Sequence, residues 1–168
     1  RHDPLDAAVE RAWRSGIVVV VAAGNAGPGA GTISAPANDP MVITAGAVDD
    51  GGTAVRSDDV PALFSGRGPT PVDGIAKPDV TAPGAHLVSL RAPGSAVDSE
   101  FPAGAVDATY RRGSGTSHSA AVVSGSVALL LSAHPRLAPD EVKFALVATA
   151  GPVASSDGSA VGAGLVDV

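Results

Sequence analysis

Residues 113–117 read Gly-Ser-Gly-Thr-Ser and lead directly into a long helical pattern. A serine at a helix start lies where free backbone N–H groups and the positive end of the helix dipole favour a developing negative charge. The glycines before it let a substrate backbone approach closely. The Ser117 hydroxyl is therefore a candidate nucleophile, and the Ser117 N–H is a candidate donor to an oxyanion. On spacing alone, the same stretch is more often only a turn and a helix cap.

A second polar group follows an apolar strand pattern. Residues 17–21 form a continuous β-branched run, which is typical of a buried parallel strand, and Ala22-Ala23-Gly24-Asn25 comes directly after it. In α/β folds, sites form at the carboxyl ends of parallel strands. The side-chain NH₂ of Asn25 is therefore a candidate for the second oxyanion donor.

Three further blocks follow in order: Phe64 to Pro69 (FSGRGP), Lys77 to Gly84 (KPDVTAPG) and Gly162 to Asp167 (GAGLVD). With the GTS and AAGN motifs, they make the chain resemble the subtilisin-like serine proteases (subtilases, the S8 peptidase family) from about Ala7 to Val168. The resemblance implies that Ser117 is the catalytic nucleophile and that the Asn25 amide completes the oxyanion hole. It also implies a set of substrate-binding residues, namely Ala22, Ala23, Gly24, Gly115 and Thr116.

The sequence contains no evident general base for this serine. A serine nucleophile needs one, and the family supplies it from a His-Gly-Thr-His type motif, with an aspartate in an Asp-Ser/Thr-Gly type motif; neither motif occurs in these 168 residues. His118 follows Ser117 directly, but adjacent residues of a helix point about 100° apart, which favours a helix-surface or pocket-rim histidine. It is also polar where the family is usually apolar. His2, His86 and His134 lie far from the motif in sequence.

We therefore expect residues 1–168 to be the C-terminal portion of a subtilase catalytic domain, a serine endopeptidase whose N-terminal part is absent, and to be inactive alone. The predicted fold is α/β, a parallel sheet flanked by helices, subtilisin-like and incomplete. The predicted helices are Asp3–Ser15, Thr116–Ala133 and Pro139–Thr149, and the predicted strands are Ile17–Val21, Met41–Val48 and His86–Leu90. Residues 93–112 are expected to form a loop or a weak hairpin.

Composition excludes several function classes. The chain has 11 Lys and Arg against 17 Asp and Glu, a net charge of −6, which disfavours a nucleic-acid partner. It has no cysteine, which excludes disulfides and thiolate metal sites. Apolar runs fall short of the roughly 20 residues that span a bilayer, so no membrane partner is expected.

The acidic and glycine-rich segments do not fit metal or nucleotide sites. Asp49, Asp50, Asp58 and Asp59 lack the regular spacing of a calcium loop, so a solvated turn is favoured. We expect no required cofactor and no metal at the site; structural calcium is implied only by resemblance for the full domain, with Asp39 in a loop where relatives place a weak cation site. The glycines of residues 24–31 do not fit a nucleotide-binding motif.

The expected partners are a peptide or protein substrate and the missing N-terminal part of the same domain. An unpaired sheet edge would also favour self-association. An extracellular, secreted location is implied by the resemblance. The alternative function is a non-catalytic interaction module derived from a protease, whereas an esterase is opposed by the lack of a G-x-S-x-G motif around Ser117.

Overall fold

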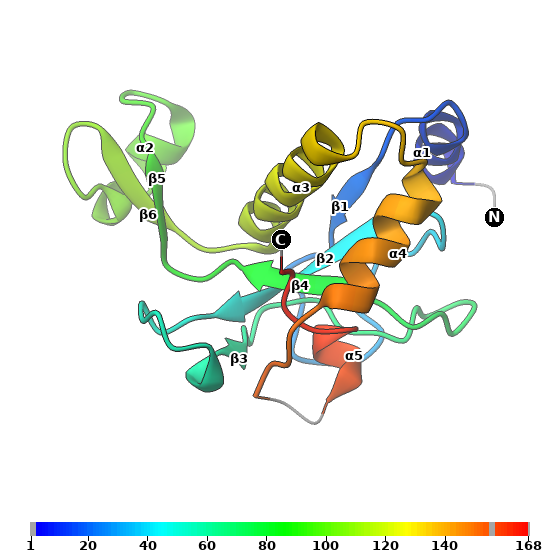
Figure 1. Ribbon diagram of the computed structural model, residues 1–168. Helices are drawn as coiled ribbons and strands as arrows, with labels where there is room; N and C mark the ends of the chain where they lie inside the picture. The colour runs from blue at the N-terminus through cyan, green and yellow to red at the C-terminus, as the bar shows by residue number, and fades with distance from the viewer. Residues whose placement is uncertain (1–2, 155–156, 168) are drawn as a thin grey trace.

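The computed structural model describes residues 3–154 and 157–167, and its centre is a small sheet in which strand β2 (Ile43–Asp49) has neighbours on both sides (Figure 1). Ala45 pairs in parallel with Ala22 of β1 (Val20–Ala22) and with Val80 of β4 (Val80–Pro83). The short strand β3 (Val60–Pro61) runs antiparallel to the end of β2. The carboxyl ends of β1, β2 and β4 therefore lie at one edge of the sheet.

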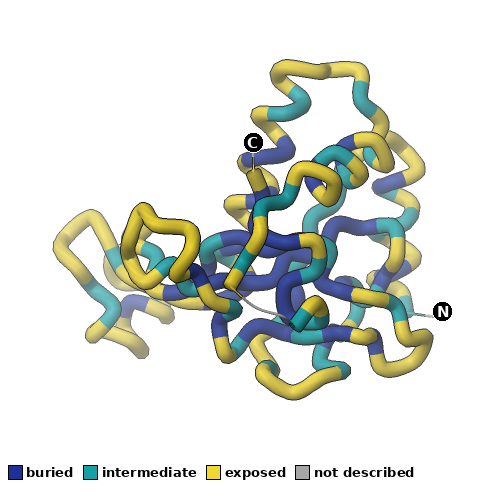
Figure 2. The backbone as a smooth tube through the Cα atoms, turned by 60° about the horizontal axis from the view of Figure 1, so that its bottom comes forward, coloured by how far each residue is buried: buried dark blue, intermediate teal, exposed yellow. Residues whose placement is uncertain are grey.

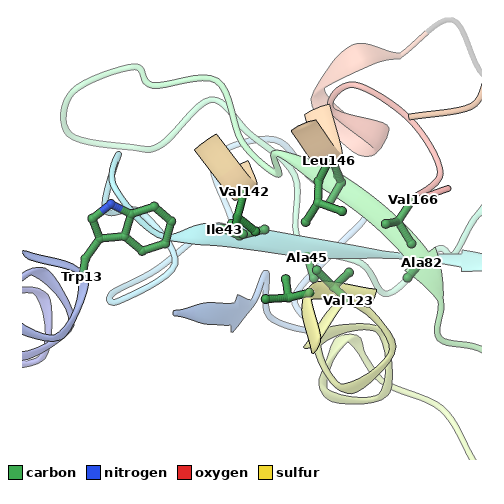
Figure 3. Packing of buried hydrophobic residues seen from close by; sticks show 10 residues of the cluster. Trp13, Ile43, Ala45, Ala82, Val123, Val142, Leu146 and Val166 are labelled. Carbon is green, nitrogen blue, oxygen red and sulfur yellow. The ribbon is translucent and has the colours of Figure 1, made fainter. Parts of the chain in front are cut away.

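Three helices supply the core on one face of this sheet. They are α1 (Pro4–Arg14), α3 (Thr116–Ala133) and α4 (Pro139–Thr149). Figure 3 shows Val123 of α3 and Val142 and Leu146 of α4 gathered around Ile43 and Ala45 of β2. Burying such aliphatic side chains contributes about 1.5–3 kcal/mol each. The short helix α5 (Gly158–Val161) lies near the sheet beside Gly46, where an added Cβ would come 3.4 Å from the Ala160 carbonyl oxygen.

The helix boundaries follow local signals, and all three predicted helices are confirmed. The Asp3 side chain accepts a hydrogen bond from Leu5 N (2.8 Å), and Pro4 occupies the first turn of α1. In α4, Pro139 is at the first turn and the Glu141 carboxylate accepts a hydrogen bond from Ala138 N (2.8 Å), which supplies the cap that alanine cannot.

The strand predictions were less accurate. The predicted strand over residues 17–21 is only Val20–Ala22, and it is half-buried rather than buried on both faces, since β1 pairs on one edge alone among the described residues. Residues 87–90 do form a strand, β5 (Leu87–Leu90), but outside the main sheet. β4, which does belong to that sheet, was missed. The predicted α/β class with a parallel sheet is nevertheless confirmed.

Residues 87–113, here called the arm, project from the body of the molecule and are mostly exposed (Figures 1 and 2). β5 pairs antiparallel with β6 (Tyr110–Gly113), and between them lie helix α2 (Ala96–Glu100) and the 3-10 turn Pro102–Gly104. The predicted loop or weak hairpin of residues 93–112 therefore contains a helix that was not predicted, and its strand residues 110–112 pair with β5 outside that range. Arg91 holds the base of α2 through two hydrogen bonds to Asp98, at 2.6 and 3.0 Å. These bonds lower the pKa of Asp98 below its ordinary value.

Helix α3 is long and apolar enough to cross a membrane when judged by length and composition only. In this fold it is the helix that packs on the sheet, in contact with β1, β2 and β4. One side of the helix is buried there, with Val123 and Val127 in the core, whereas Val122 and Leu129 are exposed.

A buried charge cluster fixes the chain that enters β4. The Lys77 side chain is 2% exposed and donates to Asp79 Oδ2 (2.6 Å) and the Val42 carbonyl (2.9 Å). Asp79 Oδ2 also accepts from Thr44 N (2.7 Å), and Asp79 Oδ1 lies 3.1 Å from Lys143 Nζ. Two lysines thus share one carboxylate, and burial lowers the pKa of Lys77 to about 8, although Asp79 opposes the shift.

We expect stability to rise with alkaline pH because of Lys77. Between about pH 8 and the ordinary lysine value of 10.5, the unfolded chain binds a proton that the folded chain does not, so the free energy of unfolding should increase across this window by on the order of 3 kcal/mol. Urea unfolding at several pH values, compared with Lys77→Met, measures this. The variant should lack the rise, and equal slopes in both proteins would contradict the assignment.

Candidate active site

Ser117 lies in the first turn of α3, exposed, at the carboxyl end of β4. Two contacts hold this turn against the end of the strand: Gly115 N donates to the Gly84 carbonyl (2.8 Å), and Ser119 Oγ donates to the Ala82 carbonyl (3.1 Å). A Cβ on Gly84 would collide with Ser119 Oγ, so only glycine allows this approach. The position of Ser117 is therefore set directly by the sheet.

Asn25 is oriented by the residue that precedes the nucleophile. Its Oδ1 accepts hydrogen bonds from Thr116 N (2.9 Å) and from Thr116 Oγ1 (3.0 Å). The Thr116 hydroxyl in turn accepts from Gly24 N (3.1 Å). Because both bonds fall on the oxygen of the Asn25 amide, its NH₂ group is directed away from them and remains available to a ligand.

The two predicted oxyanion donors converge on one place. An ideal Cβ built on Gly115 would lie 3.5 Å from Asn25 Nδ2 and 3.9 Å from Ser117 N, so both nitrogens lie within 4 Å of a common point. Among the described residues, neither Asn25 Nδ2 nor Ser117 N donates a hydrogen bond. Both nitrogens are unpaired among the described residues and lie near Gly115, which is compatible with an oxyanion hole formed by these two groups.

The loop after β1 forms the neighbouring surface. The FSGRGP segment runs alongside it, with Gly66 N donating to the Gly24 carbonyl (2.8 Å) and Gly27 N to the Phe64 carbonyl (2.9 Å). Of the predicted substrate-binding residues, Ala23, Gly115 and Thr116 are buried, and Ala22 and Gly24 are half-buried. Their contact with substrate stays a prediction. The orienting role of Thr116 was missed, although its place between a glycine and the serine of the motif was visible.

No histidine in the described part of the chain acts on Ser117, whose hydroxyl makes no hydrogen bond there. His134 is the C-cap of α3, at the far end of the helix. His86 lies with its Nε2 atom 3.8 Å from Asp49 Oδ2. His118 is half-buried and its Nδ1 atom has no hydrogen-bond partner. His2 lies outside the described residues.

The aspartates that follow β2 accept hydrogen bonds within turns. Asp49 and Asp50 accept hydrogen bonds from Gly51 N (3.1 Å) and Gly52 N (3.0 Å), and the Asp58 carboxylate accepts from Thr53 Oγ1 (3.2 Å). Burial, with the neighbouring Asp50 and Asp58, raises the pKa of Asp59. Within residues 3–154 and 157–167, no group of three or more His, Asp or Glu side chains could hold a metal. Asp39 is buried and accepts from Met41 N (2.8 Å).

A serine at a helix N-terminus with a convergent pair of oxyanion donors at the carboxyl end of a parallel sheet defines a serine-hydrolase type of site. The family model of the subtilases matches residues 1–164, and the chain belongs to this family. It is 46% identical to Serine protease AprX of Bacillus subtilis (strain 168) over 167 residues, which is 99% of this chain and 38% of that protein. It is 36% identical to Subtilisin DY of Bacillus licheniformis over 98% of this chain and 50% of that protein.

Solved structures show the same fold. Sphericase matches with a TM-score of 0.74 at 26% identity, and the prenylagaramide maturation protease PagA with a TM-score of 0.71 at 29% identity. Each match covers 97% of this chain and 52% of the other. The predicted subtilisin-like fold is therefore confirmed. The chain spans about half the length of each solved structure and 38% of the length of AprX.

Proposed function

We propose that this chain is the nucleophile-bearing and oxyanion-bearing part of a subtilisin-like serine endopeptidase. The observation that carries the proposal is the pair of unpaired donors, Asn25 Nδ2 and Ser117 N, which both lie within 4 Å of the Cβ position of Gly115, at the start of the helix that carries the Ser117 hydroxyl. The full domain would hold an aspartate and a histidine on its N-terminal part, as the family motifs imply. Its substrates are peptides or proteins.

The reaction assigns one role to each group. Ser117 Oγ attacks the scissile carbonyl carbon, and its proton passes to the histidine base of the N-terminal part. Asn25 Nδ2 and Ser117 N donate hydrogen bonds to the oxyanion of the tetrahedral intermediate. The amine leaves with the proton from that histidine, and water then hydrolyses the acyl ester on Ser117 by the same steps in reverse order.

Residues 1–168 alone should show no measurable turnover of a fluorogenic peptide, because removing triad members leaves only about 10³–10⁴-fold catalysis over water. Co-expression with an N-terminal segment that carries the Asp and His motifs should restore turnover. Robust turnover by the chain alone, abolished by Ser117→Ala, would contradict the division of roles. A stable complex with the N-terminal segment that never cleaves peptide would favour the non-catalytic interaction module.

We also propose that residues 1–168 self-associate. β1 has an unpaired edge among the described residues, and α3 exposes apolar side chains, including Leu129 at 66% exposure. Light scattering should detect dimers or larger species at high concentration, and Leu129→Lys should reduce them. Val72→Lys, the same change at a loop residue that is 92% exposed, is the matched control. A clean monomer at every concentration would refute the proposal.

Secretion is proposed from family membership. An antibody against the chain should detect the parent protein in the culture medium of its source cells. Detection in the cell lysate alone would count against an extracellular location.

A further inference from the structure

A cavity of about 280 Å³ lies between the arm and the first turn of α3. Residues of one face of the β5–β6 hairpin and residues beside the nucleophile line it together. Arg111 and Gly113 of β6 point to the same face, as does Ser89, which pairs with Arg111 across the strands. The lining residues are Ser89, Leu90, Val97, Arg111, Gly113, Ser114 and His118.

His118 presents a hydrogen-bond donor in this cavity. Its ring lies against Gly113, where an added Cβ would come 2.9 Å from Cε1, so the glycine makes room for the imidazole. The Nδ1 atom is buried and has no hydrogen-bond partner. A buried unpaired N–H costs more than a buried unpaired acceptor. The ring proton of the neutral form therefore belongs on Nε2, which makes this atom a donor.

Arg111 carries a positive charge, and not all of its N–H groups make hydrogen bonds. Its Nη2 atom donates to the Phe101 carbonyl (3.2 Å), whereas its buried Nη1 atom makes no hydrogen bond and lies 3.5 Å from Asp98 Oδ1. That carboxylate is already held by both Arg91 bonds and by Gly94 N (3.1 Å). Because this carboxylate is shared with Arg91, it neutralises Arg111 only in part. The Nη1 atom itself is buried, so Arg111 acts on the cavity through its positive charge.

The other polar lining groups are also donors. The Ser114 oxygen accepts from His86 N (2.9 Å), so the hydroxyl proton remains free to donate, and Ser89 adds a second hydroxyl. Neither an aspartate nor a glutamate lines the cavity. A space lined by a guanidinium, an imidazole N–H and two hydroxyls fits an anionic acceptor with two oxygens.

We propose that this cavity is a carboxylate subsite of the peptide-binding surface, which rests on the proposed protease function. The carboxylate is that of a substrate Glu or Asp side chain, or of a peptide C-terminus. Arg111 and His118 are the specificity-determining residues. The subsite adjoins Ser117 because His118 follows it in the same helical turn.

Binding of blocked pentapeptides to residues 1–168, measured by isothermal titration calorimetry, tests the proposal. In the first pair, one peptide carries a central Glu and its control a central Gln. In the second pair, one peptide ends in a free carboxylate and its control in an amide. We expect at least one carboxylate peptide to bind about tenfold tighter than its neutral partner. The pair that shows this preference identifies the source of the carboxylate.

The preference should fall to near one in Arg111→Gln and be reduced in His118→Leu. Arg112→Gln is the matched control, since Arg112 is exposed on the other face of β6, and it should keep the preference. Equal binding of both partners in each pair, no binding of any peptide, or an equal loss in Arg112→Gln would overturn the proposal. Circular dichroism checks that each variant is folded.

Peptide binding requires no turnover, so the experiments can refute the carboxylate subsite and the protease function independently. If no preference for carboxylate peptides is found but co-expression restores turnover, the subsite proposal alone is refuted. A preserved preference without turnover after co-expression would sink the protease function and leave a carboxylate-binding surface.

Discussion

Replacement of Ser117 by alanine is expected to lower kcat of the enzyme restored by co-expression by about 10⁶-fold, the magnitude known for the nucleophile of subtilisin, which belongs to the same family. The neighbouring Thr116 hydroxyl is not expected to substitute, because it is engaged with Asn25 Oδ1 (3.0 Å), whereas the Ser117 hydroxyl makes no hydrogen bond among the described residues. The acyl-enzyme cannot form without it, so steady-state hydrolysis of a fluorogenic peptide measures the loss directly.

Ser124→Ala is the matched control for this experiment. Ser124 is exposed on the same helix, and its hydroxyl donates only to the Ala120 carbonyl (2.7 Å), within α3. Its loss should leave kcat unchanged within a factor of about two. If Ser124→Ala and Ser117→Ala lose activity equally, the effect comes from damage to the helix and the nucleophile assignment is wrong.

Asn25→Leu should lower kcat by about 10²–10³-fold with little change in KM. This magnitude too is known for the oxyanion asparagine of subtilisin. The reason for the split is that, in the proposed role, Asn25 Nδ2 would donate to the oxyanion that develops in the transition state and tetrahedral intermediate, and less strongly to the ground-state carbonyl. Separate determination of kcat and KM for one peptide series tests this. A change in KM alone would assign Asn25 to ground-state binding.

Substitutions at Thr116 test the same donor, Asn25 Nδ2, through the residue that orients it. Thr116→Val removes the hydroxyl that bonds Asn25 Oδ1 but keeps the shape and the backbone N–H that bonds the same oxygen. We expect a loss in kcat of about tenfold, smaller than for Asn25→Leu, with near-complete rescue in Thr116→Ser. Equal losses in the Val and Ser variants would show that Thr116 acts through packing.

The helices were predictable because their signals are local. Pro4 and Pro139 mark first turns, and the bounds of α3 were predicted to the residue, since a glycine precedes it and an apolar periodic pattern fills it. The strands depend on partners far away in sequence. β4 follows Pro78 and ends at Pro83, and its pairing with β2 makes it a strand.

The β5 segment was correctly predicted to be a strand, but its pairing partner was not foreseen. It is a short, mainly apolar run, which is typical of a strand but does not say which strand will be the partner. The residues between 90 and 110 return the chain to β5 itself, so it pairs with β6 instead of joining the parallel sheet. Its sequence was compatible with either arrangement.

The site was partly predictable. Ser117 and Asn25 were predicted from their motifs, and the structure places Asn25 Nδ2 and Ser117 N near the same residue, Gly115, while their catalytic roles stay predictions. The bonds that orient Asn25 were not foreseen, because they join residues 91 positions apart and depend on distances that no spacing rule contains. The cavity beside His118 was likewise invisible, since it exists only where the arm meets α3.

The two ends of the arm are joined to each other directly in front of the nucleophile. His86 N bonds to Ser114 Oγ at its base, and Gly115 N bonds to the Gly84 carbonyl just behind it. Residues 87–113 can therefore change in length or sequence while these bonds keep Ser117 in register with the sheet. The arm can therefore vary, by evolution or by engineering, and change which substrates the site accepts. The residues that position Ser117 need not change with it.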